Sequence, residues 1–217
     1  MRLSILFSLL PLALAIPNPD AAHALADRTV AAPALKSDTP FQISVLSESD
    51  KSTTILSQFA NAASLHFFIG VGANTYCIPG VPCGTPNDAI GNGTSIACGA
   101  SGGGCGMYSE VPGGQDVYVN STGALSFTFA HEEGNFPPGS ATKGFSTKNG
   151  VFTFTGLGST GWIACPIFKD GTGPYQVFAK VKGISNADVP NGKLASCIGF
   201  KAKATASDDD ALVWQYD

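Results

Sequence analysis

The sequence predicts an all-β protein, built as a single antiparallel β-sandwich or barrel-like domain that is stapled by disulfides. From residue 41 onward, apolar residues recur with a period of two rather than 3.6, which is the spacing of strands that bury one face. Turns rich in Gly, Pro, Asn and Asp separate roughly eight to ten such runs. Six cysteines follow an export signal, and an even count in an exported chain indicates disulfides.

Residues 1–15 are interpreted as a secretory signal peptide. A basic residue precedes the apolar run LSILFSLLPLALA, which ends in the small-x-small pattern Ala13-Leu14-Ala15. The run has about 13 residues, fewer than the roughly 20 that a membrane-spanning helix needs, and no other stretch is predicted to cross a membrane. Residues 16–36 are rich in Ala and Pro and are interpreted as a disordered linker or a short pro-segment. One β-domain is therefore expected over residues 37–217.

The first strands are expected where apolar and polar residues alternate or where a short apolar run stands between turns. In FQISVL, Phe41, Ile43 and Val45 alternate with polar partners, as in a half-buried strand. SLHFFIGV, residues 64–71, is a mostly apolar run of strand length. Between them, residues 51–63 (KSTTILSQFANAA) form the one helical candidate, since Ile55, Leu56 and Phe59 would share a helix face.

Residues 117–133, VYVNSTGALSFTFAHEE, are predicted to form a β-hairpin. The second half of this segment alternates regularly. It places Leu125, Phe127 and Phe129 on one face, and Ser126, Thr128 and Ala130 on the other.

Four further strands are expected toward the C-terminus. VFTFT follows Asn149-Gly150, which is the strongest short hairpin signal. YQVFAKVK puts Tyr175, Val177, Ala179 and Val181 on one side, with Lys180 and Lys182 opposite, and FKAKATA repeats that arrangement. In LVWQY, Leu212, Trp214 and Tyr216 share a face.

Residues 76–114 differ from the rest, because they hold four cysteines, a GASGGGCG run and several prolines. We expect a disulfide-pinned, Gly-rich loop region there rather than core strand. The spacing suggests two short local loops, Cys77–Cys83 and Cys98–Cys105, and a long-range bridge, Cys165–Cys197. Zinc is the rival interpretation, but the sequence has no CxxC pair and an exported chain meets oxidising conditions.

Composition limits the classes of partner. Charged residues make up 13% of the chain, against about 25% in an average protein, and the formal net charge is −4. Nucleic acid is not expected as a partner, because its binding asks for a basic face. Two sequons, at Asn92 and Asn120, are predicted glycosylation sites. The oligomeric state stays open.

His131, Glu132 and Glu133 are the residues most suggestive of chemistry. A glycosidase needs two carboxylates some 5 to 10 Å apart across a cleft, whereas adjacent residues at a strand end point in opposite directions. A metal would need a third ligand, and the domain has one other histidine, His66. We therefore expect solvated polar residues at a strand end, no cofactor and no enzyme. A secreted carbohydrate-active enzyme that uses these residues is the alternative.

Carbohydrate binding is predicted more readily than catalysis. Exposed aromatic rings on a β-domain can stack on sugars, and the candidates are Trp162, Tyr175, Trp214 and Tyr216. Each of them is also interpreted as a core residue. Residues 207–210, SDDD, are read as a solvated loop, since one contiguous run seldom supplies the six to eight oxygens that calcium takes.

A series of short motifs resembles the PhiA family of fungal cell-wall proteins, some of which are described as IgE-binding antigens. The motifs are EVPGGQDVYVNSTGALSFTFAH, FPPGSA, FTFTGLGSTGWIACP, YQVFAKV, LASCIGFKAKA and a closing WQY, in this order. The likeness runs from residue 41 to residue 217 and includes Cys77 and Cys83 as a first cysteine pair, whereas Cys98 and Cys105 look like an addition.

The resemblance implies a secreted, non-enzymatic cell-wall protein that supports the formation of asexual spore-bearing structures and protects under stress. The expected partners are wall polysaccharide or other wall proteins. A released antigen or effector-like interaction protein is a further alternative.

Overall fold

The computed structural model describes residues 35–48, 54–76, 78–79, 94–99, 102–132, 134–207 and 213–217. Several predictions fall outside these residues: the signal peptide, most of the linker, Cys77, Cys83, Asn92, Glu133, residues 208–210 and Leu212. The described part confirms the all-β prediction, because its regular elements are strands and short 3₁₀ turns. It contains no helix long and apolar enough to cross a membrane.

The strands in chain order are β1 (Phe41–Glu48), β2 (Ala60–Ala63), β3 (His66–Ile69), β4 (Thr75–Tyr76), β5 (Ser95–Cys98), β6 (Cys105–Met107), β7 (Asp116–Val119), β8 (Leu125–Phe127), β9 (Phe145–Ser146), β10 (Val151–Phe154), β11 (Trp162–Pro166), β12 (Tyr175–Ala179), β13 (Ile198–Ala206) and β14 (Gln215–Tyr216). The 3₁₀ turns are η1 (Lys148–Gly150), η2 (Gly156–Gly158), η3 (Asn186–Asp188) and η4 (Leu194–Ser196).

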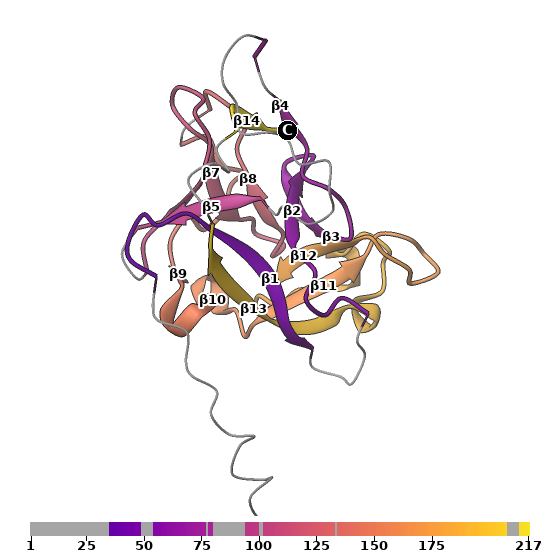
Figure 1. Cartoon of the computed structure of the whole chain (residues 1–217). Coiled ribbons are helices and arrows are strands. Elements are labelled where there is room, and N and C mark those ends of the chain that lie inside the picture. The colour runs from indigo at the N-terminus through magenta and orange to yellow at the C-terminus, as the bar shows by residue number, and fades with distance from the viewer. Residues whose placement is uncertain are drawn as a thin grey trace, which may run out of the picture. The chain divides into compact units, whose positions relative to one another are not determined.

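The main sheet closes on itself (Figure 1). Its strands pair in the order β1-β5-β6-β7-β8-β3-β12-β11-β13-β10-β9, and β13 pairs with β1 as well. Strand β2 is added to β3, and β4 and β14 form a separate two-stranded sheet. The closed ring is the barrel-like form of the predicted fold, and one side of each strand faces a shared core.

The longest ladder joins β1 to β13, so that Phe41 pairs with Ala206 and Glu48 with Phe200. The predicted alternation of β1 is confirmed, since Phe41, Ile43 and Val45 are all buried. The register shifts between Val45 and Ser47, and this irregularity leaves Leu46 exposed.

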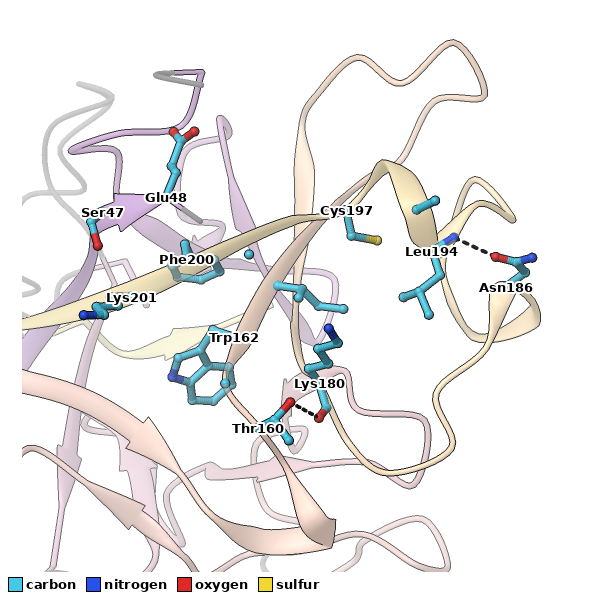
Figure 2. A pocket seen from close by; sticks show the side chains of 14 residues that line it. Ser47, Glu48, Thr160, Trp162, Lys180, Asn186, Leu194, Cys197, Phe200 and Lys201 are labelled. Atoms are coloured by element: carbon cyan, nitrogen blue, oxygen red, sulfur yellow. Dashed lines mark hydrogen bonds between the residues drawn. The ribbon is translucent and has the colours of Figure 1, made fainter. Parts of the chain in front are cut away.

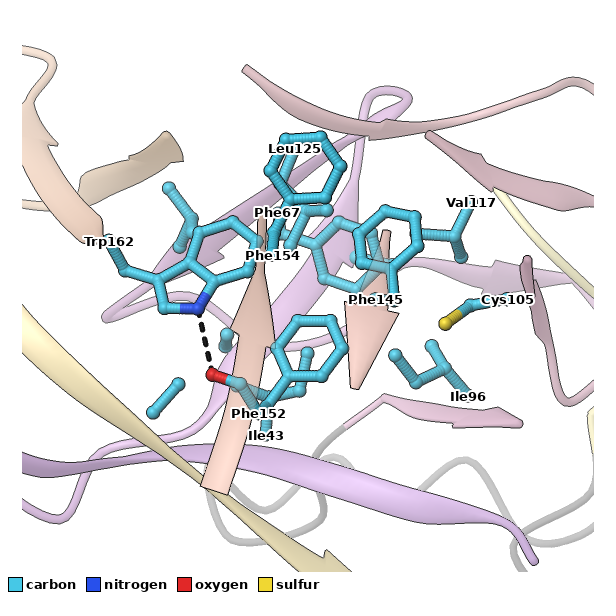
Figure 3. Packing of buried hydrophobic residues seen from close by; sticks show 14 of the residues in the cluster. Ile43, Phe67, Ile96, Cys105, Val117, Leu125, Phe145, Phe152, Phe154 and Trp162 are labelled. Atoms are coloured by element: carbon cyan, nitrogen blue, oxygen red, sulfur yellow. Dashed lines mark hydrogen bonds between the residues drawn. The ribbon is translucent and has the colours of Figure 1, made fainter. Parts of the chain in front are cut away.

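The core contains a stack of aromatic rings around Trp162 (Figure 3). The indole lies parallel to the ring of Phe152, with the ring centroids 5.2 Å apart, and Phe152 in turn stacks on Phe145 at 5.8 Å. The indole Nε1 donates a hydrogen bond of 2.8 Å to the carbonyl oxygen of Phe152. Because the polar atom of the indole is satisfied inside the core, the whole side chain contributes to packing.

The expectation of loop rather than core strand for residues 76–114 is wrong for part of that region. Strands β5 and β6 form a hairpin, and Ile96 and Met107 are buried in the core. Cys98 and Cys105 face each other in this hairpin and form the predicted disulfide. Strand β6 begins within the Gly-rich run, at Cys105, and the few apolar residues of this region are sufficient for two short strands.

The helical candidate at residues 51–63 is also corrected in its described part. Ser57 has a φ of 61°, which ends any helix, and the chain continues into β2. The Val45 and Ser57 amides donate to the carbonyl oxygens of Gln58 and Val45, respectively. Ile55 is fully buried while Leu56 is exposed, so the apolar residues of this segment serve a turn that packs on β1.

The hairpin at β7 and β8 is confirmed, but the predicted faces of its second strand are not. Leu125 and Phe127 are buried, whereas Phe129 is 57% exposed. Strand β8 ends at Phe127, and the chain turns away at His131, where φ is 64°. Ser126 is buried on the opposite face, so both sides of β8 are covered and simple alternation fails there.

The buried side chain of Gln115 helps to hold the C-terminal segment. The Oε1 atom of the Gln115 side chain accepts a hydrogen bond of 2.8 Å from the backbone amide of Tyr216. Its Nε2 atom donates a hydrogen bond of 2.8 Å to the carbonyl oxygen of Tyr216. It therefore satisfies both backbone polar groups of Tyr216, as a neighbouring strand would. Tyr216 is only 3% exposed, and burial raises the pKa of its hydroxyl to about 12.

Candidate functional site

A groove of about 800 Å³ lies on the outer face of β11 and β13 (Figure 2). Trp162 and Ile163 of β11 and Phe200 and Lys201 of β13 line it, and the end of β1 contributes Ser47 and Glu48. The other rim comes from the turns η3 and η4, which supply Asn186, Leu194 and Ala195. A hollow of this size lies within the range of small-molecule and oligosaccharide sites.

The rim is fixed to the sheet by apolar packing and by a disulfide. Ile163, Cys165 and Phe178 point outward from β11 and β12 and form a cluster with Val189, against which Leu194 packs. The predicted bridge Cys165–Cys197 is present and joins β11 to the residue that precedes β13. The segment that carries η3 and η4 is thus covalently closed where it returns to the sheet.

The turn η3 begins with a capping box. The backbone amide and the hydroxyl of Ser185 both donate to one carboxylate oxygen of Asp188, at 2.8 and 2.7 Å. Asn186, the next residue, accepts a bond of 2.8 Å from the Leu194 amide through its Oδ1 atom. That bond ties η3 to η4 and leaves the NH₂ group of Asn186 as the donor on the groove rim.

The middle of the groove has little side-chain volume. Gly161 precedes β11 in a position where an added Cβ atom would meet no atom within 4 Å. Its φ of +146° lies in the region that favours glycine. The backbone can therefore be approached closely here, between the exposed side chains of Lys180 and Lys201.

Glu48 is the carboxylate among the groove-lining residues. One of its oxygens accepts a hydrogen bond of 2.8 Å from the Ile55 amide. This hydrogen bond stabilises the turn that follows β1, so Glu48 has a structural role at the edge of the groove.

The residues predicted to be most suggestive of chemistry lie elsewhere, in an exposed turn. His131 and Glu132 are both exposed, and the Glu132 carboxylate accepts a long bond of 3.4 Å from the Asn135 side chain. Glu133 lies outside the described residues. Among the described residues, no three His, Cys, Asp or Glu side chains come together as metal ligands would. Neither His131 nor Glu132 therefore belongs to a metal-ligand group of three among the described residues.

A polar row that sequence reasoning missed crosses three strands. Tyr118 of β7, Ser126 of β8 and His66 of β3 are direct cross-strand partners. The Nδ1 atom of His66 lies 2.8 Å from the hydroxyl of Ser126, and Tyr118 is the cross-strand partner of Ser126 on its other side. The register that aligns them cannot be read from local spacing, because His66 is 60 residues from Ser126.

This row resembles a serine–histidine pair but lacks the access that nucleophilic catalysis needs. Ser126 has no exposed surface, and Phe136 covers Tyr118 edge-on with ring centroids 5.5 Å apart. Burial lowers the pKa of His66, so its neutral form is favoured inside the fold. The arrangement satisfies polar groups that are buried between the sheet and the loop that covers it.

The four aromatic candidates for sugar contact separate into two pairs. Trp162 is 5% exposed, and Tyr216 is buried as well, so the core takes up both rings. Tyr175 and Trp214 are half-buried. Of the four, Trp162 alone also contributes to the lining of the groove.

The described sequon lies at the tip of the β7–β8 hairpin. The Oδ1 atom of Asn120 accepts three hydrogen bonds, from the amides of Thr122 and Ala124 and from the Thr122 hydroxyl. The side-chain oxygen of Asn120 thus stabilises the turn. These three hydrogen bonds do not involve the side-chain nitrogen, which is the atom that would carry a glycan.

Comparison with known proteins gives one family and one relative. The model of a family described as PhiA-like secreted protein matches residues 41–217. A protein of Arthroderma benhamiae, named as an uncharacterized secreted protein, is 35% identical over 195 residues, which cover 86% of this chain and 92% of that protein. No solved structure matches.

Proposed function

The chain belongs to the PhiA-like secreted protein family, and we propose that it is a non-catalytic protein of the fungal cell wall. In the proposal, the groove on β11 and β13 binds wall polysaccharide. Through this attachment the protein supports the formation of asexual spore-bearing structures. The observation that carries the proposal is the groove itself.

The chemistry of the groove suits a sugar chain. Its lining combines apolar surface from Ile163 and Leu194 with hydrogen-bonding groups from Thr160 and Asn186. Gly161 leaves the backbone open between them. Sugars present both apolar faces and hydroxyl groups, so a site that mixes the two kinds of surface is suited to hold them.

The non-catalytic part of the proposal is supported by where the candidate residues lie. His131 and Glu132 stand in an exposed turn, and the buried Ser126 has no route to a substrate. A general acid or base must reach the reacting group directly or through one water molecule. Neither set of residues lines the groove.

A depletion assay tests the proposal. The secreted, oxidised protein is mixed with washed fungal walls, insoluble chitin and insoluble β-glucan, and the protein that stays in solution is measured. We expect wild type to be depleted by at least one of these, and Ala195→Trp, which fills the groove from its rim, to stay in solution. Ala187→Trp is the matched control, because Ala187 is also exposed, belongs to η3 and does not line the groove.

Two outcomes would contradict the proposal. Wild type that stays in solution with all three materials would refute direct attachment to the wall and favour a released interaction protein. Equal depletion of wild type and Ala195→Trp would place the binding surface elsewhere. The developmental part is tested separately, by comparing conidium counts in a deletion strain that is complemented with wild type, Ala195→Trp or Ala187→Trp.

A further inference from the structure

The charges of this acidic chain are distributed very unevenly. Residues 134–207 contain eight lysines and two aspartates, whereas residues 94–132 contain three acidic residues and no lysine or arginine. The eight lysines are Lys143, Lys148, Lys169, Lys180, Lys182, Lys193, Lys201 and Lys203. Because β9 to β13 belong to residues 134–207 and are contiguous in the sheet, this basic segment forms one side of the barrel.

Two of these lysines face each other across the groove. Trp162 pairs with Ala179 on one side and with Phe200 on the other. One step earlier, Gly161 therefore lies between Lys180 and Lys201, and the Lys180 amide donates to the Gly161 carbonyl oxygen at 2.8 Å. Since neighbouring strands are about 4.8 Å apart, the Cα atoms of the two lysines are separated by about 10 Å.

Gly161, Lys180 and Lys201 are cross-strand neighbours, so the side chains of the two lysines lie on the same side of the sheet. Trp162 and Phe200, their neighbours, belong to the core, and side chains alternate along a strand. Lys180 and Lys201 therefore project outward, which agrees with their exposure. Gly161 contributes no side chain between them, so the two ammonium groups flank an open gap rather than a filled surface.

The described acidic residues on this side are engaged in hydrogen bonds within their own turns. Asp188 is used in the capping box with Ser185, and Asp170 accepts from the amide and hydroxyl of Thr172 in its own turn. Glu48 is bonded to the Ile55 amide at the groove edge. Among the described residues, neither Lys180 nor Lys201 makes an ion pair, so both cations are free to meet an external anion.

We propose that the groove binds an acidic glycan, that is, a polysaccharide that carries carboxylate or phosphate groups. The inference rests on the proposed function and names the class of polymer. Lys180 and Lys201 bind anionic groups on the two sides of the chain, and the sugar passes over Gly161. The NH₂ group of Asn186 donates to sugar hydroxyls, and the hydroxyl of Thr160, which itself donates to the Lys180 carbonyl oxygen, accepts from them.

This pairing explains how a chain with a net charge of −4 can bind an anionic polymer. The field near a surface depends on the local charges, because those further than about 8 Å are screened at physiological salt. A basic groove on an acidic protein also orients the encounter, since the other side of the barrel repels the same polymer. Binding should therefore weaken as salt is added.

The test compares soluble glycans of different charge. Polygalacturonate supplies carboxylates, a phosphomannan supplies phosphates, and laminarin is a neutral β-glucan. Affinities are measured by titration calorimetry with the full secreted protein at low and high salt. We expect wild type to bind one or both acidic glycans at least tenfold more tightly than laminarin, and whichever of them binds identifies the anionic group.

Two double variants separate the groove from the overall charge. Lys180→Gln/Lys201→Gln is expected to lose about tenfold in affinity for the acidic glycan. Lys143→Gln/Lys169→Gln makes the same change in net charge at exposed positions outside the groove, and its affinity should change less than twofold. Lys180→Arg/Lys201→Arg should retain binding. Thermal unfolding of each variant verifies that it is folded.

The outcomes distinguish this inference from the proposed function. Equal affinity of wild type for laminarin and the acidic glycans would overturn the charge inference and leave wall binding intact. Equal losses in the groove variant and the control variant would show a response to net charge alone, which also overturns it. If no glycan binds and washed walls do not deplete the protein, both proposals fail.

Discussion

The two sides of the barrel use the same construction and differ in what they present to solvent. The side formed by β5 to β8 is acidic, and the side formed by β9 to β13 is rich in lysine. Each contains one disulfide, Cys98–Cys105 between β5 and β6 and Cys165–Cys197 between β11 and the residue before β13, and each buries its aromatic rings in one core. Because the two sides share their construction and differ in surface charge, we attribute the charge asymmetry to recognition rather than to stability.

The two disulfides also differ in what they close. Cys98–Cys105 closes a tight hairpin with a sequence separation of 7, and Cys165–Cys197 closes a segment with a separation of 32 that includes β12 and the groove rim. The first bridge reinforces contacts that are already local. The second holds together parts of the chain that would otherwise be far apart when the protein is unfolded.

The largest expected effect comes from the aromatic stack on the lysine-rich side. Trp162→Ala should lower the free energy of unfolding by about 4 kcal/mol, because it leaves a cavity beside Phe152 and removes the donor to the Phe152 carbonyl. Denaturant unfolding followed by circular dichroism measures the change.

Phe127→Ala is the counterpart on the acidic side. Phe127 is fully buried and packs edge-on against Phe67, with ring centroids 5.8 Å apart, so a similar loss of stability is expected. At a temperature where both variants remain folded, Trp162→Ala should lose glycan binding and Phe127→Ala should keep it. Loss of binding in both would mean that the two sides are not functionally distinct.

The next largest effect is the loss of stability that follows removal of each disulfide. From loop length alone, replacing Cys165 and Cys197 by Ala should cost about 3.7 kcal/mol, and replacing Cys98 and Cys105 by Ala about 2.5 kcal/mol. Unfolding curves of the two double variants, with unreduced wild type as reference, give both values. A larger loss for the hairpin bridge would show that β5 and β6 depend on their disulfide more than their burial suggests.

The smallest effect is a pH dependence on the acidic side. Burial lowers the pKa of His66 below its ordinary value of about 6.5. As pH falls below 6.5 the unfolded chain binds a proton before the folded chain does, so the free energy of unfolding should decrease, by at most about 1.4 kcal/mol per pH unit, until the folded histidine is protonated too. Above 6.5 the effect is absent.

The variant His66→Gln isolates this effect, because it should differ from wild type in pH dependence only below about pH 6.5. Thermal melts between pH 4 and pH 8 make the comparison. Identical profiles for wild type and His66→Gln would show that the polar row with Ser126 does not titrate with folding.

The strands with regular alternation were predictable from sequence, and those in densely covered parts of the barrel were not. The alternation of β1 and the Asn149-Gly150 hairpin agree with the structure because one face of each segment meets the core. Strand β8 departs from prediction because loops cover its second face, which local periodicity does not encode. Strands β5 and β6 were missed since each is too short for a pattern to develop.

The candidate site could likewise be predicted only in part from the sequence. The lysines and Trp162 stand in strands that were expected, but the groove depends on the register that brings Lys180 and Lys201 to either side of Gly161. Register among three strands is a tertiary property. The charge asymmetry between residues 94–132 and 134–207 was present in the sequence and is the signal that could have indicated this side of the barrel.

The closure between β1 and β13 has a consequence for how the protein is made. Strand β1 enters the secretory compartment early, while its principal partner is among the later strands to be synthesised. Until then its apolar face and its backbone edge are unpaired, a state that favours association between chains. We therefore expect maturation to depend on protection of the nascent N-terminal strands, and the yield of secreted protein to follow chaperone capacity more closely than transcription.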